Sequence, residues 1–475
     1  MLSGCRNNSA AGNALWARGF SARPGTTAAA AGVAVDARGN VFVAGLFHGE
    51  IDVGLGPLRS SSPQGYASDD LVVLKLDPLG APRWAHHYPH VSRAALAVDP
   101  SGGIVVTGAV YGDSDFGGGL VASSATHAEL FFFKLDDAGQ HVFSRRFASD
   151  SHVLANSVAV SPQGDITIAG SLAGSIDVGG GVLVKDCCGY DLFVAGFDAE
   201  GKHRFSLTSG SEGGVDLYSP ALAALSDGGV VVSANFSGSI SFGGLGVTAP
   251  PQPEPKTQFE RHFGAPIVSN IFLARLDPKG HIVWSKQPGS SGDQSLRAVA
   301  ADGAGRVLVW GESNGPVDFG LGPLTGERTD FVLASVNVDG KTAWAKRFTG
   351  KTLLIPATQH AHRMAAGAGA TAVAGRVAGR VDWGAGQLSG DGDTFIARFS
   401  TDGRHNWSKV LPSTVNAYVE GLAIDAAGNV IAAGTFTGDV DLGGAKLSAL
   451  RPGGPSTSST ALADSDAFIV KFAAR

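Results

Sequence analysis

Two groups of histidines are the side chains in this sequence best suited to holding a metal ion or a ligand. His86, His87 and His90 form one group, and His360 and His362 form the other. Alternate residues of a strand point to the same side of a sheet, so a His-x-His pair could present two imidazoles to zinc. Neither group has a third ligand at a recognisable spacing. We therefore predict no metal site and keep these five histidines as candidates for a binding face.

Carboxylates offer a second kind of chemistry, because two acids at a suitable separation can hydrolyse a glycosidic bond. The sequence contains no P-loop and no His-Glu-x-x-His motif. It does not show which of its loop acids meet in space. We therefore predict no enzyme, no catalytic residue and no cofactor, and keep a polysaccharide hydrolase or lyase as the alternative. The acids that could serve it are Asp69, Asp70, Glu129, Asp293, Asp391 and Asp393.

The best-repeated charged groups are aspartates in the pattern Asp-Φ-Gly, where Φ is apolar. They are Asp52, Asp115, Asp177, Asp318, Asp382 and Asp441. Oxygen ligands of this kind would suit calcium. A role shared by so many copies is better explained by a carboxylate that caps the backbone of its own turn. We therefore expect these aspartates to be structural.

These aspartates belong to a repeat that organises the chain. Its anchor residue ends a segment such as Gly32–Gly45 and recurs at intervals of 59 to 77 residues. A glycine lies six residues before every anchor, and Asp-Φ-Gly begins seven residues after it, with serine replacing aspartate in the fourth unit. This constant internal spacing identifies a repeat protein. The anchors are Gly45, Gly108, Gly170, Ala234, Gly311, Gly375 and Gly434.

Each unit has a second half that reads Lys-Leu-Asp-x-x-Gly-x-x-x-Trp in its clearest copy. Phenylalanine replaces the tryptophan in two units. The fixed position of the aromatic residue beside a turn favours packing between neighbouring units over stacking on a sugar. We therefore expect a structural role for Trp16, Trp84, Trp284, Trp344 and Trp407.

Both halves of a unit read as two short β-runs joined by a tight glycine turn, so a unit holds about four antiparallel strands. Helical periodicity is not visible. The sequence therefore predicts an all-β fold, a single seven-bladed β-propeller of four-stranded antiparallel blades over residues 12–475. The last unit lacks its closing strand, and Gly12–Trp16 carries the missing pattern. We expect the N-terminal strand to complete the last blade and close the ring.

The variable connections indicate which face binds a partner. The first and third turns of a unit hardly vary, whereas the second connection and the connection between units carry the insertions. Both of these connections emerge on one face, and varied loops on a rigid scaffold are the usual seat of function. We expect a monomer that binds a protein or a glycan there. The insertions are Ser60–Asp69, Thr248–Pro266 and Leu447–Asp464.

Charge and cysteine content exclude other classes of protein. The net charge is −6 and no five like charges adjoin, which argues against a nucleic-acid partner. The longest apolar stretches are too short to span a membrane. Cys5, Cys187 and Cys188 form neither a disulfide framework nor a CxxC pair.

The repeat resembles the SBBP-type β-propeller repeats of bacterial surface and secreted proteins. This resemblance implies a propeller and an extracytoplasmic setting, but no common activity. Leu2–Cys5 resembles a bacterial lipobox, which implies lipidation of Cys5 and a tether over residues 1–11. We expect a non-catalytic lipoprotein of the cell envelope that touches the membrane only through its lipid. Because no signal segment precedes the cysteine, a cytoplasmic scaffold stays an alternative.

Overall fold

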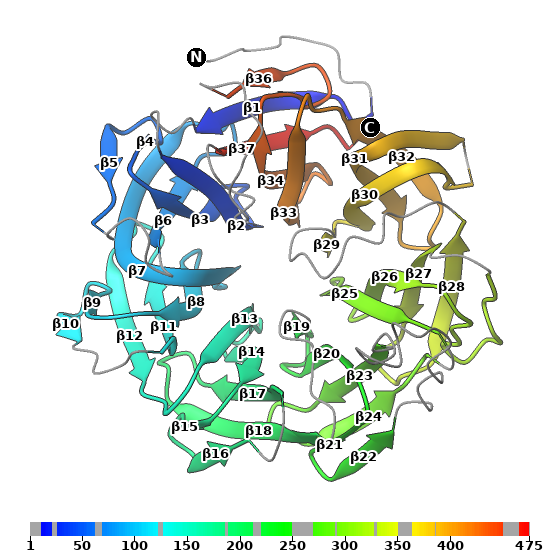
Figure 1. The fold of residues 1–475 in the computed structure, drawn as a ribbon, viewed down its shortest axis with the longest axis horizontal. Helices are drawn as coiled ribbons and strands as arrows, with labels where there is room; N and C mark the ends of the chain where they lie inside the picture. Colours follow the sequence, from blue (N-terminus) through cyan, green and yellow to red (C-terminus); the bar gives the residue numbers. More distant parts are fainter. Residues whose placement is uncertain are drawn as a thin grey trace, which may run out of the picture.

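The structure of the chain is a computed structural model. It describes residues 11–20, 26–61, 69–121, 127–185, 189–211, 220–248, 269–289, 292–326, 330–349, 363–384, 386–449 and 465–474. Within these ranges the chain forms β-strands and no α-helix, which confirms the all-β class. The strands pair antiparallel throughout, and Figure 1 shows their sheets arranged around a common centre.

Three four-stranded sheets each take their strands in the order of the sequence, and in the first of them β21 (Ser239–Phe242) and β22 (Leu245–Thr248), which belong to another sheet, intervene. Their strands are β19 (Ala221–Ala224), β20 (Val230–Phe236), β23 (Asn270–Leu276) and β24 (Ile282–Lys286); β25 (Gln294–Ala301), β26 (Val307–Ser313), β27 (Asp330–Val336) and β28 (Thr342–Phe348); and β29 (Arg363–Gly367), β30 (Ala370–Asp382), β31 (Gln387–Ser400) and β32 (His405–Leu411). The first strand of each lies nearest the centre in Figure 1. These sheets match the predicted unit of four antiparallel strands.

Two larger sheets join neighbouring units. A seven-stranded sheet contains β2 (Thr27–Val35), β3 (Val41–His48), β6 (Asp69–Leu76), β7 (Pro82–Val98), β8 (Ile104–Val110), β11 (Glu129–Leu135) and β12 (His141–Phe147). A six-stranded sheet contains β13 (Val153–Val160), β14 (Ile166–Leu172), β17 (Asp191–Phe197), β18 (His203–Ser211), β21 (Ser239–Phe242) and β22 (Leu245–Thr248). The long β7 pairs with β6 through its first half and with β8 through its second, so it serves two units.

The first and last strands of the chain lie side by side. A four-stranded sheet contains β1 (Ala14–Phe20), β37 (Asp466–Phe472), β34 (Val430–Thr437) and β33 (Asn416–Ile424), in that order. In the β1–β37 pair, Ala14 lies opposite Phe472 and Phe20 lies opposite Ala467. The predicted pairing of the N-terminal strand with the last unit is therefore present.

Small two-stranded hairpins carry four of the six Asp-Φ-Gly aspartates. They are β4 (Glu50–Asp52) with β5 (Pro57–Arg59), β9 (Ser114–Asp115) with β10 (Leu120–Val121), β15 (Ser175–Asp177) with β16 (Val182–Val184), and β35 (Asp439–Asp441) with β36 (Lys446–Ser448). Each follows the second strand of its unit, where the second connection begins.

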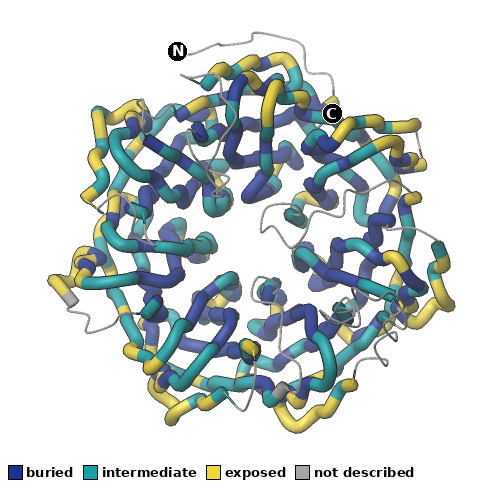
Figure 2. Tube along the Cα trace, in the orientation of Figure 1, coloured by how far each residue is buried: buried dark blue, intermediate teal, exposed yellow. Residues whose placement is uncertain are grey.

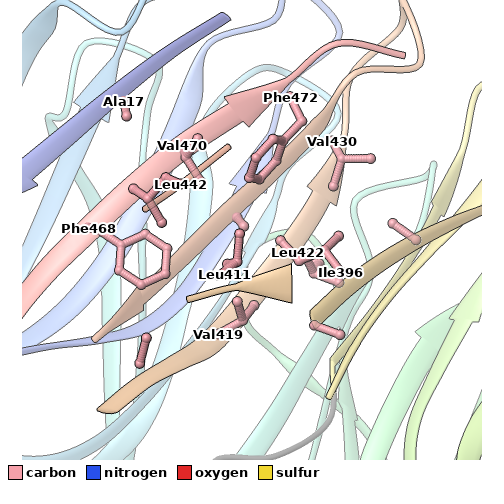
Figure 3. Packing of buried hydrophobic residues seen from close by; sticks show 14 of the residues in the cluster. Ala17, Ile396, Leu411, Val419, Leu422, Val430, Leu442, Phe468, Val470 and Phe472 are labelled. Atoms are coloured by element: carbon pink, nitrogen blue, oxygen red, sulfur yellow. The ribbon is translucent and has the colours of Figure 1, made fainter. Parts of the chain in front are cut away.

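The hydrophobic core lies between neighbouring sheets. Central strands such as β8 and β17 are buried at every residue, because other sheets cover both of their faces. In one cluster, Ile396 and Leu411 from one sheet pack with Val419, Val430 and Phe468 from the next (Figure 3). Figure 2 shows that exposed residues concentrate at the periphery.

The repeated aromatic residues connect each unit to the next. Trp84 lies against Gly139, where an added Cβ would sit 2.9 Å from the indole, and its Nε1 donates a hydrogen bond to the Asp137 carbonyl (3.2 Å). Glycine is required there, because φ is +82° and the ring occupies the side-chain position. The same contact joins Trp16 to Gly80, Phe143 to Gly201, Phe205 to Gly280, Trp284 to Gly340, Trp344 to Gly403 and Trp407 to Gly12.

Candidate functional site

Five strands near the centre share an irregularity. In each, one extra residue interrupts the pairing with the next strand, which makes a β-bulge. A bulge bends its strand and redirects a side chain. All five bulge residues line one cavity of about 550 Å³, which we call the central cavity. They are Ala31, Ser92, Asn156, Arg297 and Glu420.

The central cavity lies at the end of the ring where the innermost strands begin. Its wall includes Ala29–Ala31 of β2, Ala155–Ser157 of β13 and Arg297–Val299 of β25. Asp69, the first residue of β6, also lines it and follows the second connection of its unit. The cavity is therefore at the end that the variable connections approach, where we predicted binding.

Charged side chains and small side chains share this wall. The charged residues are Arg93, Arg297, Arg363, Asp69 and Glu420. Alanines from β2, β7, β13, β19 and β25 occupy much of the remaining surface and leave the space open. The volume lies within the range of small-molecule pockets, which are roughly 300–1,000 Å³.

One ion pair is built into the wall between neighbouring sheets. Nη2 of Arg363 in β29 lies 2.9 Å from Oε2 of Glu420 in β33. The Arg363 Nε also donates to the backbone carbonyl of Glu420 (2.6 Å). The Glu420 side chain is 6% exposed and that of Arg363 is 31% exposed, so the pair is fixed while the guanidinium still reaches solvent.

Asp69 is a carboxyl group that holds its proton more readily than usual. Burial raises its pKa, the neighbouring Asp70 raises it further, and His48 opposes the shift. A carboxyl group whose pKa is raised in this way is a candidate proton donor within the cavity.

A second cavity, of about 390 Å³, lies at the opposite end of the ring. The first turns of five units form it, including Asp36–Arg38, Asp99–Gly102 and Asp302–Gly303. Its carboxylates serve their own turns: Asp302 Oδ1, for example, accepts hydrogen bonds from the backbone N–H groups of Ala304 (2.9 Å) and Arg306 (3.0 Å). We call this the turn-end cavity, and its polar groups maintain the fold.

The predicted histidines of the first group lie on β7, away from the central cavity. The His86 ring lies tilted against Trp84 with 5.3 Å between ring centroids, and His87 Nε2 is 4.0 Å from Asp70 Oδ2. His86 and His87 line a separate hollow of about 490 Å³ with His141. His90 adopts a φ of +62° at the bend of the strand. His360 and His362 lie outside the described residues, so the proposed binding role of the two groups stays a prediction.

The Asp-Φ-Gly carboxylates cap their own turns. Asp52 Oδ1 accepts hydrogen bonds from the N–H groups of Gly54 (2.7 Å) and Gly56 (3.2 Å). The other members accept the corresponding N–H group two residues later, with distances of 2.6 to 3.0 Å. These members are Asp115, Asp177, Asp318, Asp382 and Asp441. The contacts are those of the structural role that we expected.

The loop acids considered for catalysis separate into different places. Asp69 lines the central cavity, whereas the fully buried Asp70 accepts a hydrogen bond from Ser61 N (2.9 Å). Glu129 pairs with Arg146 at 2.6 Å, both 5% exposed, and Asp293 accepts from Ser269 N (2.9 Å). Asp391 donates its backbone N–H to the Asp393 carboxylate (3.2 Å). The carboxylate that accompanies Asp69 in the cavity is Glu420, which the sequence analysis did not select.

Ser313 is a nucleophile candidate that the sequence analysis overlooked. Gly311–Gly315 reads Gly-Glu-Ser-Asn-Gly and matches the letters of the Gly-x-Ser-x-Gly elbow. The elbow needs an exposed serine between a strand and a helix. Ser313 is 1% exposed at the end of β26 and donates its hydroxyl to the Gly315 carbonyl (2.7 Å), and no helix follows within the described residues. The segment therefore matches the elbow in its letters only, and Ser313 has a structural role.

Two further findings concern metals and membranes. Among the described residues, no cluster of three or more His, Cys, Asp or Glu side chains is arranged to bind a metal ion. The same part of the chain holds no helix with the length and hydrophobicity that crossing a bilayer requires. Cys5, Cys187 and Cys188 lie outside the described residues.

Comparison with known proteins finds likeness in structure. No protein-family model and no curated protein matches the sequence. The β-propeller domain of the Trilobed protease from Pyrococcus furiosus has 9% identity and a TM-score of 0.43, over 91% of this chain and 98% of that one. An ulvan lyase, a polysaccharide lyase, has 10% identity and a TM-score of 0.42, over 88% and 93%. A protein of unknown function from Dyadobacter fermentans has 11% identity and a TM-score of 0.39, over 96% and 98%. No activity follows for this chain.

Proposed function

We propose that this chain is a seven-bladed, closed β-propeller of the SBBP type that binds a glycan or a protein segment at its central cavity without transforming it. The aromatic–glycine contacts are evidence for the ring, because they join each unit to the next. The contacts of Trp407 with Gly12 and of Trp16 with Gly80 join the last units to the first. The pairing of β1 with β37 supports closure by the N-terminal strand. The SBBP assignment rests on the repeat pattern.

The observation that carries the binding proposal is the variety of the bulge residues. In four units the repeat places a bulge five residues before the first turn and fills it with alanine, asparagine, arginine or glutamate, and a fifth bulge, at Ser92, lies two residues further from its turn. A scaffold position would carry one residue type, as the Asp-Φ-Gly position nearly does. Positions of constant geometry and different chemistry are suited to contacting different parts of one asymmetric ligand.

A steric block tests this proposal without touching charge. Ala31→Trp places an indole at a bulge of the central cavity, and Ala37→Trp places the same bulk in the turn-end cavity. Binding to a panel of immobilised bacterial polysaccharides and synthetic peptides is measured by biolayer interferometry. We expect Ala31→Trp to abolish binding and Ala37→Trp to preserve it. Equal binding by the two folded variants would remove the central cavity as the site.

We propose an extracytoplasmic location, with a lipid on Cys5, as the setting of this activity. The support is the lipobox-like Leu2–Cys5 and the repeat resemblance. Mass spectrometry of the N-terminal peptide from the native membrane fraction tests it. An acylated cysteine supports an envelope lipoprotein, whereas an unmodified peptide from Met1 in the soluble fraction supports the cytoplasmic scaffold.

A polysaccharide hydrolase or lyase is the second candidate, and Asp69 is the observation that favours it. A carboxyl group with a raised pKa shares the cavity with the carboxylate of Glu420. Such a pair could supply a general acid and a base. Release of shorter saccharides by the wild type, lost in Asp69→Asn, would establish turnover. Tight binding with no product would favour the non-catalytic proposal.

A further inference from the structure

We infer that the central cavity binds an acidic sugar, and that Arg93 and Arg297 recognise its carboxylate. This inference rests on the binding function proposed above and specifies its ligand. Three guanidinium groups and two carboxylates line the cavity, although the chain as a whole carries a net charge of −6. The ion pair of Arg363 with Glu420 balances one of the three positive charges against one of the two negative charges. The cavity is therefore a local concentration of positive charge in an acidic protein.

Arg297 is positioned by a dedicated contact. It is the bulge residue of β25, and the backbone of Leu296 just before it is held by Asn235 of the neighbouring β20. Asn235 Oδ1 accepts the Leu296 N–H (2.9 Å), and its Nδ2 donates to the Leu296 carbonyl (2.9 Å). Asn235 is fully buried. Two hydrogen bonds from one rigid amide fix the backbone that directs the arginine.

Arg93 approaches the cavity from a different sheet. It follows Ser92, the bulge residue of β7, and pairs with Ala109 of β8. Arginines on two separate rigid strands can address one anionic group from two directions. The guanidinium is planar and always charged, and its paired N–H groups match the two oxygens of a carboxylate.

The other polar groups of the cavity favour a hydroxylated ligand with a single negative charge. Asp69 and Glu420 can accept hydrogen bonds from hydroxyl groups, and Ser157 and Asn156 can donate or accept them. With three arginines and two carboxylates the lining has an excess of one positive charge, which matches a single carboxylate better than a phosphate, which carries about −1.5 to −2 charges at neutral pH. A uronic acid, with one carboxylate and several hydroxyls, satisfies both requirements. An acidic peptide offers carboxylates but few hydroxyls, so it is the competing ligand.

Isothermal titration calorimetry of the full chain with trigalacturonic acid tests the inference. Maltotriose is the neutral probe of equal length, and an Asp-rich peptide is the competing acid. Arg297→Gln and Arg93→Gln remove charge from two different strands. Arg38→Gln is the matched control, because Arg38 lines the turn-end cavity and is 70% exposed. Thermal melting of each variant establishes that it folds.

We expect trigalacturonic acid to bind at least tenfold more tightly than maltotriose. Arg297→Gln and Arg93→Gln should each weaken its binding by at least tenfold, and Arg38→Gln by less than twofold. Asn235→Leu should also weaken binding, but it should add nothing once Arg297 is glutamine, because it acts through that residue. If Asn235 were purely structural, Asn235→Leu would weaken binding equally in the wild type and in Arg297→Gln.

Two results would overturn the inference and leave the proposed function intact. One is maltotriose or the peptide binding as tightly as the trisaccharide acid while Ala31→Trp still blocks it. The other is trigalacturonic acid binding that ignores both arginine substitutions but is lost in Ala31→Trp. Failure of trigalacturonic acid to bind at all also overturns the inference. If Ala31→Trp alters no binding to any probe, the proposed function fails as well.

Discussion

The two ends of the central opening are built from the same repeat, yet they differ in what the repeat keeps constant. At the turn-end cavity, aspartates begin three of the five equivalent turns and bind the backbone through their carboxylates, while Ser161 and Leu225 begin the other two; the aspartates are Asp36, Asp99 and Asp302. At the central cavity four bulge residues occupy equivalent positions and differ in every unit: Ala31, Asn156, Arg297 and Glu420. Turn-capping side chains at one end maintain the scaffold, and side chains of varied charge and polarity at the other are available for a ligand.

The largest effect we expect comes from the scaffold contacts. Trp16→Ala removes the indole that packs on Gly80 and its hydrogen bond to the Pro78 carbonyl (3.1 Å). We expect a loss of about 2–4 kcal/mol in the free energy of unfolding, since large aromatic truncations cost about that much. Urea unfolding measures it. Leu79→Ala in the same turn, where Leu79 is 80% exposed, should change little. Equal effects of the two would contradict the scaffold role.

A smaller loss of stability is expected from a substitution in the turn-end cavity, and it would show that the two ends have different roles. Asp302→Ala removes a carboxylate that accepts two backbone hydrogen bonds. We expect it to lower unfolding free energy by about 1–2 kcal/mol, the usual cost of such hydrogen bonds. Affinity for trigalacturonic acid should stay within twofold of the wild type. Arg297→Gln should show the reverse pattern, with lost affinity and a melting temperature near that of the wild type. Calorimetry and thermal melting of the same samples measure both.

A rise in salt concentration should weaken ligand binding at the central cavity by a few-fold. Ion pairing between the cavity arginines and a carboxylate is screened as ionic strength rises. We expect affinity for trigalacturonic acid to fall several-fold between 50 and 500 mM NaCl. Binding that is independent of salt would argue that packing and hydroxyl contacts dominate. The Arg297→Gln variant, measured in parallel, should have a weaker salt dependence.

The smallest effect concerns pH and His405, which lies outside both cavities. Burial lowers the pKa of His405, against the opposing charge of Asp382. Because the unfolded chain then binds a proton more readily than the folded one, stability should fall as pH drops below about 6.5. His405→Gln should lose less melting temperature between pH 7.5 and 5.5 than the wild type. An identical pH dependence would show that other groups control it.

The repeat made most of the fold predictable, because fixed spacings of glycine, aspartate and tryptophan correspond directly to turns and strand ends. The four-stranded sheets, the turn-capping aspartates and the pairing of β1 with β37 follow from those spacings. The bulges were not predicted, since a change of strand register depends on backbone pairing and not on one residue type. One signal was present: Ala31, Asn156, Arg297 and Glu420 each lie five residues before the equivalent turn residue.

The histidines after the third turn show the same limit. Each follows the glycine of its third turn by one or two residues, yet His141, His203 and His405 are partly buried and His281 is exposed. Nε2 of His141 and of His203 is buried with no hydrogen-bond partner among the described residues. Both rings lie against the glycines of the Asp-Φ-Gly hairpins. His281 falls one residue earlier in its unit and is 75% exposed. The one-residue offset of His281 is visible in the sequence, whereas the contact of His141 and His203 with a folded hairpin is a tertiary feature.

The pairing of β1 with β37 also has a mechanical consequence. The strands are antiparallel, and Ala14 at the start of one lies opposite Phe472 at the end of the other. A force that pulls the segments before Ala14 and after Phe472 apart therefore loads the hydrogen bonds one at a time, as in a zipper. A shear arrangement would load them all together and resist far more. The β1–β37 pair should therefore be stable to heating, because its side chains pack in the core, yet separate under a small tension applied at those ends.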